Sequence, residues 1–349
     1  ADACKLDARR EAAGLDLYDP SDEPAPAALE EDARRAEETA LAVEGIRTVQ
    51  SASAGYGRRA FHMAASNGFE GGYMRSDRAL SCVAIAGDGS NMERDYAGES
   101  RIFQTDLPDA VEIGQLAAER TLARMGARKP KTGSYPVLFD ERVSSSLIGH
   151  LLGAINGAAI ARGSSWALDA KGTLMLPESL SVIEDPHRRR ASGSRYFDGE
   201  GLATAPRAIV ENGVLSDWTL DLATARKLGL NSTANASRGT SSPPSPSTSN
   251  IALTQGDKSR ADLIREMGTG LLVTSMIGSS ISATTGDYSR GAAGFWVENG
   301  EITYAVNECT IAGNLRDMLR SLVPANDARA YLSAVVPSLL VEGLTLAGE

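Results

Sequence analysis

The first part of the chain alternates between helix-like and strand-like patterns of apolar residues. Residues 27–44 carry an apolar side chain every three or four positions, with Glu and Arg between them, which predicts an amphipathic helix. In residues 46–105, glycines interrupt short apolar and polar alternations, which predicts several antiparallel strands. Residues 109–125 return to the helical spacing and predict a second helix.

A more apolar stretch follows Pro136. Residues 137–139 (VLF) predict a buried strand, and residues 143–161 predict a helix that is apolar nearly all round and therefore central. Beyond it, Asn212-Gly213 and Asn299-Gly300 each separate two short apolar runs, which is typical of a β-hairpin with a type I′ turn. Short helices are predicted at 259–267 and 312–322.

Helices come early and hairpins late, without regular βαβ alternation, which favours an α+β fold. We expect an N-terminal α/β domain over residues 1–130, incomplete at its start. A mostly antiparallel β domain over residues 131–349 would follow, built around the helix at 143–161. Residues 237–249 contain only Ser, Thr, Gly, Pro and one Arg, so we expect a mobile loop there.

Composition and charge exclude several classes of protein. The net charge of −10 and pI near 5.0 argue against direct nucleic-acid binding, which needs clustered Lys and Arg. The densest basic run, Arg188 to Arg190, follows Glu184 and Asp185, and we interpret it as a solvated turn. No apolar run could span a bilayer, and residues 1–4 lack a signal-peptide pattern. The first residue is not Met, which is consistent with a processed or truncated chain.

The cysteines and histidines do not form a recognisable metal motif. Cys4, Cys82 and Cys309 are widely spaced and lack CxxC, which favours neither a disulfide framework nor a zinc knuckle and fits a reducing cytoplasm. The residues that follow the three His are Met, Leu and Arg, so no HExxH or HExxxH helix exists. A metal site assembled from distant residues stays open. P-loop and nucleophile-elbow patterns are absent.

Two short constellations could carry chemistry. Residues 197–201 (FDGEG) present two carboxylates on a Gly-flanked turn, which could bind a cation or act as acid and base but is more typical of a solvated loop. Residues 286–291 place Asp287, Tyr288, Ser289 and Arg290 between two glycines. That cluster can bind a peptide's backbone or terminus, or Asp287 can pair with Arg290 and merely fix a loop. Both interpretations stay open here.

Several longer sequence motifs occur in the order typical of one family. They are MERDY at 92–96, GHLLGAI at 149–155, FDGEG at 197–201, ARKLGL at 225–230, TGDYSRGAAGFWVENGEI at 285–302 and TIAGNL at 310–315. Together they resemble the TldD/PmbA family on its PmbA (TldE) side, the family of the older "modulator of DNA gyrase" label. Members usually carry a further α/β segment before the point where this chain begins, so the resemblance implies an incomplete first domain.

The resemblance implies a cytoplasmic metalloprotease in which a TldD subunit pairs with a TldE subunit and which acts on short or unfolded peptides. The TldD side carries HExxxH and a further Cys ligand near its C-terminus. On the matching helix of this chain the motif's positions are Ser145, Ser146 and His150, and no Cys follows Cys309. We therefore expect no metal, no cofactor and no catalytic residue on this chain, with zinc only on a TldD-type partner and His150 packed in the core.

Two functional hypotheses follow. In the first, the chain is a TldE-type subunit that pairs with a TldD-like homologue and lines a peptide channel with His150, Asp287, Tyr288, Ser289 and Arg290. In the second, it is a homodimeric, non-catalytic peptide-binding or regulatory protein of the gyrase-modulator type. Neither hypothesis involves direct contact with nucleic acid or a membrane.

Overall fold

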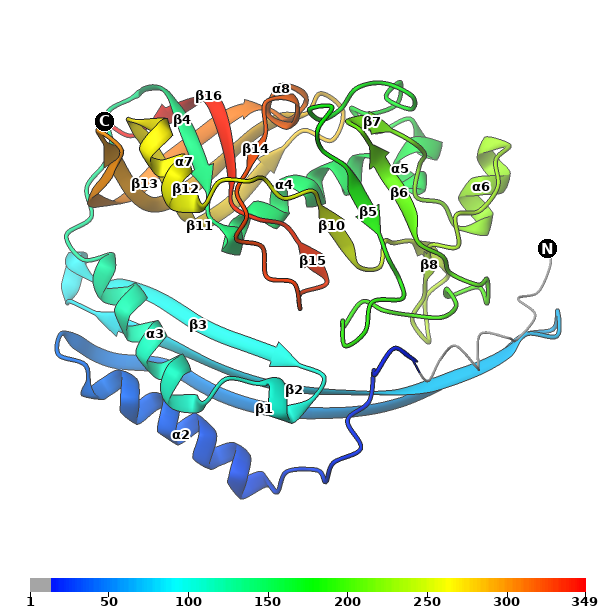
Figure 1. The fold of residues 1–349 in the computed structure, drawn as a ribbon, viewed down its shortest axis with the longest axis horizontal. Coiled ribbons are helices and arrows are strands. Elements are labelled where there is room, and N and C mark those ends of the chain that lie inside the picture. Colours follow the sequence, from blue (N-terminus) through cyan, green and yellow to red (C-terminus); the bar gives the residue numbers. More distant parts are fainter. Residues whose placement is uncertain (1–13) are drawn as a thin grey trace. The chain divides into compact units, whose positions relative to one another are not determined.

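The computed structural model describes residues 14–349, apart from the side chain of Ser90. The described chain forms two compact units (Figure 1), of which the smaller comprises residues 14–63 and 72–127 and the larger residues 64–71 and 128–349. Cys82 and Cys309 are buried and free, whereas Cys4 lies outside the described residues. No helix in the described range combines the length and apolar character needed to cross a membrane.

The smaller unit is a three-stranded sheet covered by two helices on one face (Figure 1). Its strands are β1 (Ile46–Ala64), β2 (Glu70–Ala86) and β3 (Glu93–Arg101), and its helices are α2 (Pro26–Ala42) and α3 (Ala110–Ala123); η2 (Gly89–Asn91) and η3 (Gln104–Asp106) are short turns. From Ser76 to Ala86 every second residue of β2 is buried, and Leu80, Cys82 and Ala84 pack against both helices. The predicted helices and strands are confirmed here.

The larger unit is built on a six-stranded sheet with the order β13-β12-β11-β4-β16-β14. These strands are β4 (Gly133–Phe139), β11 (Gly270–Ile281), β12 (Asp287–Glu298), β13 (Glu301–Asn314), β14 (Val323–Pro324) and β16 (Leu339–Ala347). Val137 and Phe139 join the main core with α4 (Glu141–Ala154), whereas Leu138 joins a second cluster with α7 (Arg260–Met267). Because the end of β4 is buried on both faces, residues 137–139 are continuously apolar, as predicted.

A second sheet of the larger unit has the order β15-β10-β5-β6-β7. It consists of β5 (Val182–Glu184), β6 (Arg207–Glu211), β7 (Val214–Leu215), β10 (Ile251–Leu253) and β15 (Ala334–Val335). The remaining elements are β8 (Ala236–Ser237), β9 (Ser245–Pro246), α5 (Gly157–Arg162), α6 (Leu222–Leu228) and α8 (Leu315–Arg320). The fold is therefore α+β with a sheet-rich C-terminal part, and the predicted fold class is confirmed.

Both Asn-Gly turns adopt the predicted conformation. Asn212 and Gly213 have φ angles of 48° and 78°, and Asn299 and Gly300 have φ angles of 54° and 77°. Two successive positive φ values define the type I′ turn, and each turn joins an antiparallel pair, β6–β7 and β12–β13.

The single helix predicted at 143–161 is wrong, because the chain forms α4 and α5 with a break at Ile155 and Asn156. The Asn156 side chain accepts from Ala158 N (3.0 Å) and donates to Pro246 O (2.8 Å), so it caps α5 and binds a distant segment. Thr219 N also donates to Ile155 O (3.1 Å). Local hydrophobicity predicted one helix, but these tertiary hydrogen bonds stabilise a break.

Two further boundaries differ from prediction. The helix expected at 312–322 begins only at Leu315, because residues 312–314 pair with β12 as the end of β13. The segment 237–249 is not an unstructured loop throughout, since β9 pairs with β8 and Ser247 N donates to Asn235 O (2.7 Å). Ser and Pro can be ordered by hydrogen bonds to buried groups without apolar burial of their own.

Gly114 provides a test of helix packing in the smaller unit. A Cβ at this position would lie 2.3 Å from Ala36 O, so Gly114→Ala should force α2 and α3 apart and cost about 1–3 kcal/mol of unfolding free energy. Gly149, exposed on α4 with no atom within 4 Å of its Cβ position, is the matched control. Gly149→Ala should instead stabilise by about 0.5–1 kcal/mol, because Ala is the better helix former. Denaturant unfolding of both variants would show opposite shifts, and equal shifts would contradict this account.

Candidate functional site

His150 lies on α4, the helix that packs into the main core of the larger unit. Asp140 caps the helix, its side chain accepting from Arg142 N (3.2 Å). Leu147, Ile148 and Leu151 are fully buried, whereas His150 is partly buried. Its Nε2 atom is buried and, among the described residues, has no hydrogen-bond partner. His150 is therefore at the margin of the core and has unused hydrogen-bonding capacity.

Side-chain alternation along β12 divides the four predicted residues into two pairs. Tyr288 and Arg290 are two positions apart on one face of the strand, and Asp287 and Ser289 share the other face. Tyr288 is 1% exposed, and its ring packs edge-on against the His150 ring with centroids 5.8 Å apart. The structure therefore brings His150, Tyr288 and Arg290 together and separates Asp287 and Ser289 from them.

Asp287 has a structural role at the start of α8. It accepts from Thr285 Oγ1 (2.6 Å) and Asn314 Nδ2 (3.1 Å), and these hydrogen bonds lower the pKa of its carboxyl group. Asn314 in turn caps α8 by accepting from Arg316 N (3.0 Å). Among the described residues, no hydrogen bond or ion pair joins Asp287 to Arg290, so the proposed pairing between these two residues is wrong. Asp287 fixes the loop through other partners.

Burial and one positive charge determine the electrostatics around His150. Burial lowers the pKa of His150, and the nearby guanidinium of Arg290 lowers it further. Burial also raises the pKa of Tyr288 to about 12, and its hydroxyl donates to Met276 Sδ (3.4 Å). At neutral pH the cluster therefore combines an uncharged imidazole, an uncharged phenol and a cation.

The acidic turn at 197–201 is a buried structural element and not the solvated loop we expected. Asp198 is 1% exposed and accepts from the backbone N–H groups of Glu200 (2.9 Å), Leu202 (2.9 Å) and Ala236 (3.0 Å). Glu200 accepts from Leu222 N at the start of α6 (2.8 Å), and its burial raises the pKa of its carboxyl group. These carboxylates are used to order the backbone.

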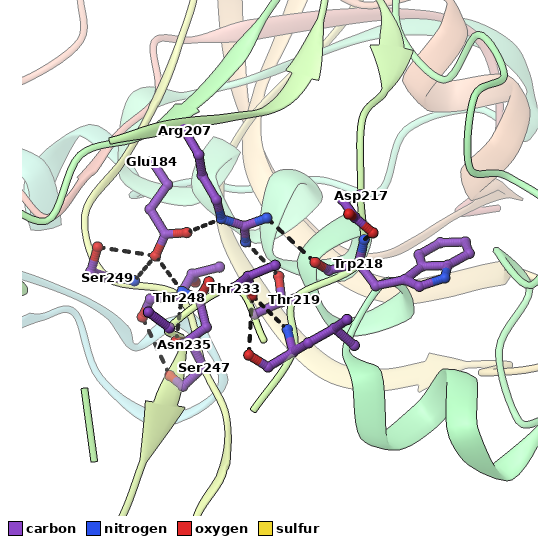
Figure 2. A network of polar contacts seen from close by, with 12 residues as sticks. Glu184, Arg207, Asp217, Trp218, Thr219, Thr233, Asn235, Ser247, Thr248 and Ser249 are labelled. Carbon is purple, nitrogen blue, oxygen red and sulfur yellow. Dashed lines mark hydrogen bonds and ion pairs between the residues drawn. The ribbon is translucent and has the colours of Figure 1, made fainter. Parts of the chain in front are cut away.

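A polar network in the second sheet was missed by the sequence analysis. Glu184 is 2% exposed and accepts from Arg207 Nε (2.8 Å), Asn235 Nδ2 (2.8 Å), and both N (2.6 Å) and Oγ (3.0 Å) of Ser249 (Figure 2). Arg207 also donates from Nη2 to Thr219 Oγ1 (3.0 Å). A buried carboxylate with four donors is satisfied and holds four chain segments together.

The interpretation of Arg188 to Arg190 as a solvated turn agrees with the exposure of two of its three residues. Arg189 and Arg190 are exposed, but Arg188 is partly buried and donates to Ala330 O. Val182 and Glu184 are buried on one face of β5 while Ile183 is exposed. This alternation is the sequence signal that could have identified β5. A charged residue at a buried position does not look like part of a strand, so Glu184 hid the pattern.

No group of three or more His, Cys, Asp or Glu residues in the described chain is placed to hold a metal ion. A shallow depression lies beside Glu184 and is lined mainly by polar side chains, Arg195, Thr204 and Asn235 among them. Its walls belong to the hydrogen-bonded network, so it is part of the scaffold. The chemically distinctive group is the cluster of His150, Tyr288 and Arg290.

Comparisons with known proteins agree with this fold over nearly the whole chain. Residues 19–125 match the model of the PmbA/TldA metallopeptidase central domain, and residues 132–348 match that of the C-terminal domain. The sequence is 40% identical over 343 residues to "Metalloprotease PmbA" of Escherichia coli O157:H7, covering 97% of this chain and 74% of that protein. It is 38% identical to "Metalloprotease PmbA homolog" of Haemophilus influenzae, of which it spans 61%.

Solved structures show the same architecture. A protein from Bacteroides thetaiotaomicron, described as a modulator of DNA gyrase, superposes with a TM-score of 0.88 at 34% identity, covering 96% of this chain and 75% of that one. TldE from Thermococcus kodakarensis has a TM-score of 0.82 at 21% identity, covering 95% of this chain and 79% of that one. The second likeness concerns the fold alone.

The buried pair of Glu184 and Arg207 provides a second test of stability. In Glu184→Gln, the amide NH₂ would face N–H and hydroxyl donors and Arg207 would lose its counter-charge, so we expect a loss of about 3–5 kcal/mol in unfolding free energy. The control is Glu266→Gln, which breaks a half-exposed pair with Lys258 (2.7 Å) and should cost less than about 1 kcal/mol. Denaturant unfolding would measure both, and similar losses would contradict the structural role of Glu184.

Proposed function

The chain belongs to the TldD/PmbA metallopeptidase family, and we propose that it is the TldE-type subunit of a cytoplasmic TldD/TldE-type protease that cleaves peptides or unfolded proteins. The observation that carries this proposal is the sequence of α4. Ser145 and Ser146 stand where the zinc motif of the TldD side has its first His and its Glu, and only His150 remains. In this proposal the partner performs the chemistry and this chain contributes a wall of the peptide channel.

The surroundings of His150 do not fit a zinc ion, which supports the proposal that this chain binds none. A zinc site requires three or four neutral or anionic donors around the metal. Instead, His150 lies beside Tyr288 and close to the positive charge of Arg290. Burial raises the pKa of Tyr288, so its phenol stays protonated and cannot serve as an anionic ligand. A cation would be repelled by Arg290, so we place zinc on the TldD-type partner only.

A second candidate function is a homodimeric, non-catalytic peptide-binding or regulatory protein. The observation that favours it is the description of the Bacteroides structure as a modulator of DNA gyrase. The two hypotheses differ in the partner, which is a TldD-like homologue in the first and a second copy of this chain in the second. Co-purification from cells that express both homologues distinguishes them.

The first prediction of the proposed function concerns metal content. After dialysis, the purified protein should contain far less than one zinc per chain, because one His cannot supply the ligands of a stable site. A TldD homologue prepared in the same way is the positive control for the metal analysis. About one zinc per chain, lost on His150→Ala, would refute the metal-free assignment.

The second prediction concerns peptide cleavage. Each subunit alone and the purified mixture are incubated with an unfolded protein and with short peptides, and the products are followed by mass spectrometry. We expect efficient cleavage only by the mixture, with complete loss after chelation of the partner's zinc. Cleavage by this chain alone, or equal cleavage with and without it, would count against the TldE-type role.

A further inference from the structure

Arg290 is a partly buried cation without a counter-charge. Its Nε donates to Gly278 O (2.8 Å), and no Asp or Glu of the described chain forms an ion pair with it. The nearest carboxylate in sequence, Asp287, lies on the other face of β12 and is bound to Thr285 and Asn314. Removing a guanidinium from water without pairing it costs free energy, so an unpaired arginine in this position suggests a missing anion.

A second polar group beside Arg290 is also unused. The buried Nε2 of His150 has no hydrogen-bond partner among the described residues, although buried ring nitrogens are normally paired. Arg290 lies two positions from Tyr288 on the same face of β12, and its positive charge contributes to the lowered pKa of His150. The Tyr288 ring packs against the imidazole and forms an apolar wall. Two polar groups with unused capacity therefore lie beside the same buried aromatic side chain.

A carboxylate matches Arg290 and His150 better than a metal cation or an amine does. The planar fork of arginine pairs with two carboxylate oxygens, and a partly desolvated site strengthens the ion pair. A neutral imidazole protonated on Nε2 could donate a further hydrogen bond to the same anion. Metal cations and amines are disfavoured by the charge of Arg290. This leaves an anion with oxygen acceptors, and peptides supply carboxylates.

We propose that Arg290, assisted by His150 and walled by Tyr288, binds a carboxylate of a peptide. This inference rests on the proposed peptide-binding function and gives it a specificity. The carboxylate is either the C-terminal group of the peptide or the side chain of Asp or Glu. In both cases a peptide that carries a carboxylate binds more tightly than its uncharged analogue.

The test uses the isolated full chain and three dansylated pentapeptides in a fluorescence-anisotropy titration. They are Ala-Ala-Leu-Ala-Ala as the free acid, the same peptide as its C-terminal amide, and Ala-Ala-Leu-Glu-Ala as the amide. We expect the free acid, the Glu peptide or both to bind at least about tenfold more tightly than the uncharged amide, a difference of about 1.4 kcal/mol. Preference for the free acid identifies the C-terminal group, and preference for the Glu peptide identifies the side chain. Equal binding of all three, or binding of none, overturns the proposal.

Variants connect the preference to Arg290. Arg290→Gln should reduce the preference for a carboxylate to about one, and Arg290→Lys should retain part of the preference because the charge remains without the fork. The control is Arg320→Gln, since Arg320 also donates from Nε to a carbonyl, that of Leu174 (3.3 Å), and has the same charge. The control should keep the full preference. Equal loss in Arg290→Gln and Arg320→Gln would indicate a general charge effect and overturn the site.

Binding by the isolated chain separates this inference from the subunit role. If the mixture with a TldD homologue fails to cleave but the Arg290-dependent preference persists, the carboxylate site stands and the TldE-type role fails. If the mixture cleaves but the three peptides bind equally, the subunit role stands and the carboxylate site is wrong. Circular dichroism and thermal unfolding of each variant confirm that the fold is intact.

Discussion

The buried negative charge of Glu184 is the constraint on which much of the larger unit depends. A carboxylate in this environment requires donors on every side, and it obtains them from β6, from Asn235 and from Ser249. Arg207 then extends the network to Thr219, whose backbone holds the junction between α4 and α5. A charge in the second sheet is thus connected by hydrogen bonds to the end of the helix that carries His150.

The two faces of β12 have different roles: residues on one face stabilise the fold, and residues on the other form the candidate binding site. On one face, Asp287 orders the turn before the strand and the start of α8. On the other face, Tyr288 fills the space beside α4 and Arg290 presents its charge near His150. Asp287, Tyr288 and Arg290 therefore belong to one rigid strand. The hydrogen bonds of Asp287 help to fix the strand that positions Tyr288 and Arg290.

The electrostatic character of this helix position agrees with the proposed division of labour between two subunits. A zinc-bearing helix needs donors that tolerate a divalent cation, whereas α4 here offers one His beside a guanidinium. In the proposed complex, the position of His150 on α4 therefore favours an anion on this subunit, and the corresponding position on the partner favours a cation. A substrate with charged ends would be oriented by that difference.

The sequence alone determined the element types, the type I′ hairpins and the family, because hydrophobic period, Asn-Gly turns and long motif words are local signals. It also identified His150, Tyr288 and Arg290 among its candidates. It did not separate them from Asp287. The four adjacent residues divide into two pairs only once they form a strand whose two faces contact different parts of the protein. The break after α4, the ordering of residues 245–249 and the burial of Glu184 depend on hydrogen bonds between residues far apart in the chain. Only the tertiary structure could decide those features, because no local pattern records a distant partner.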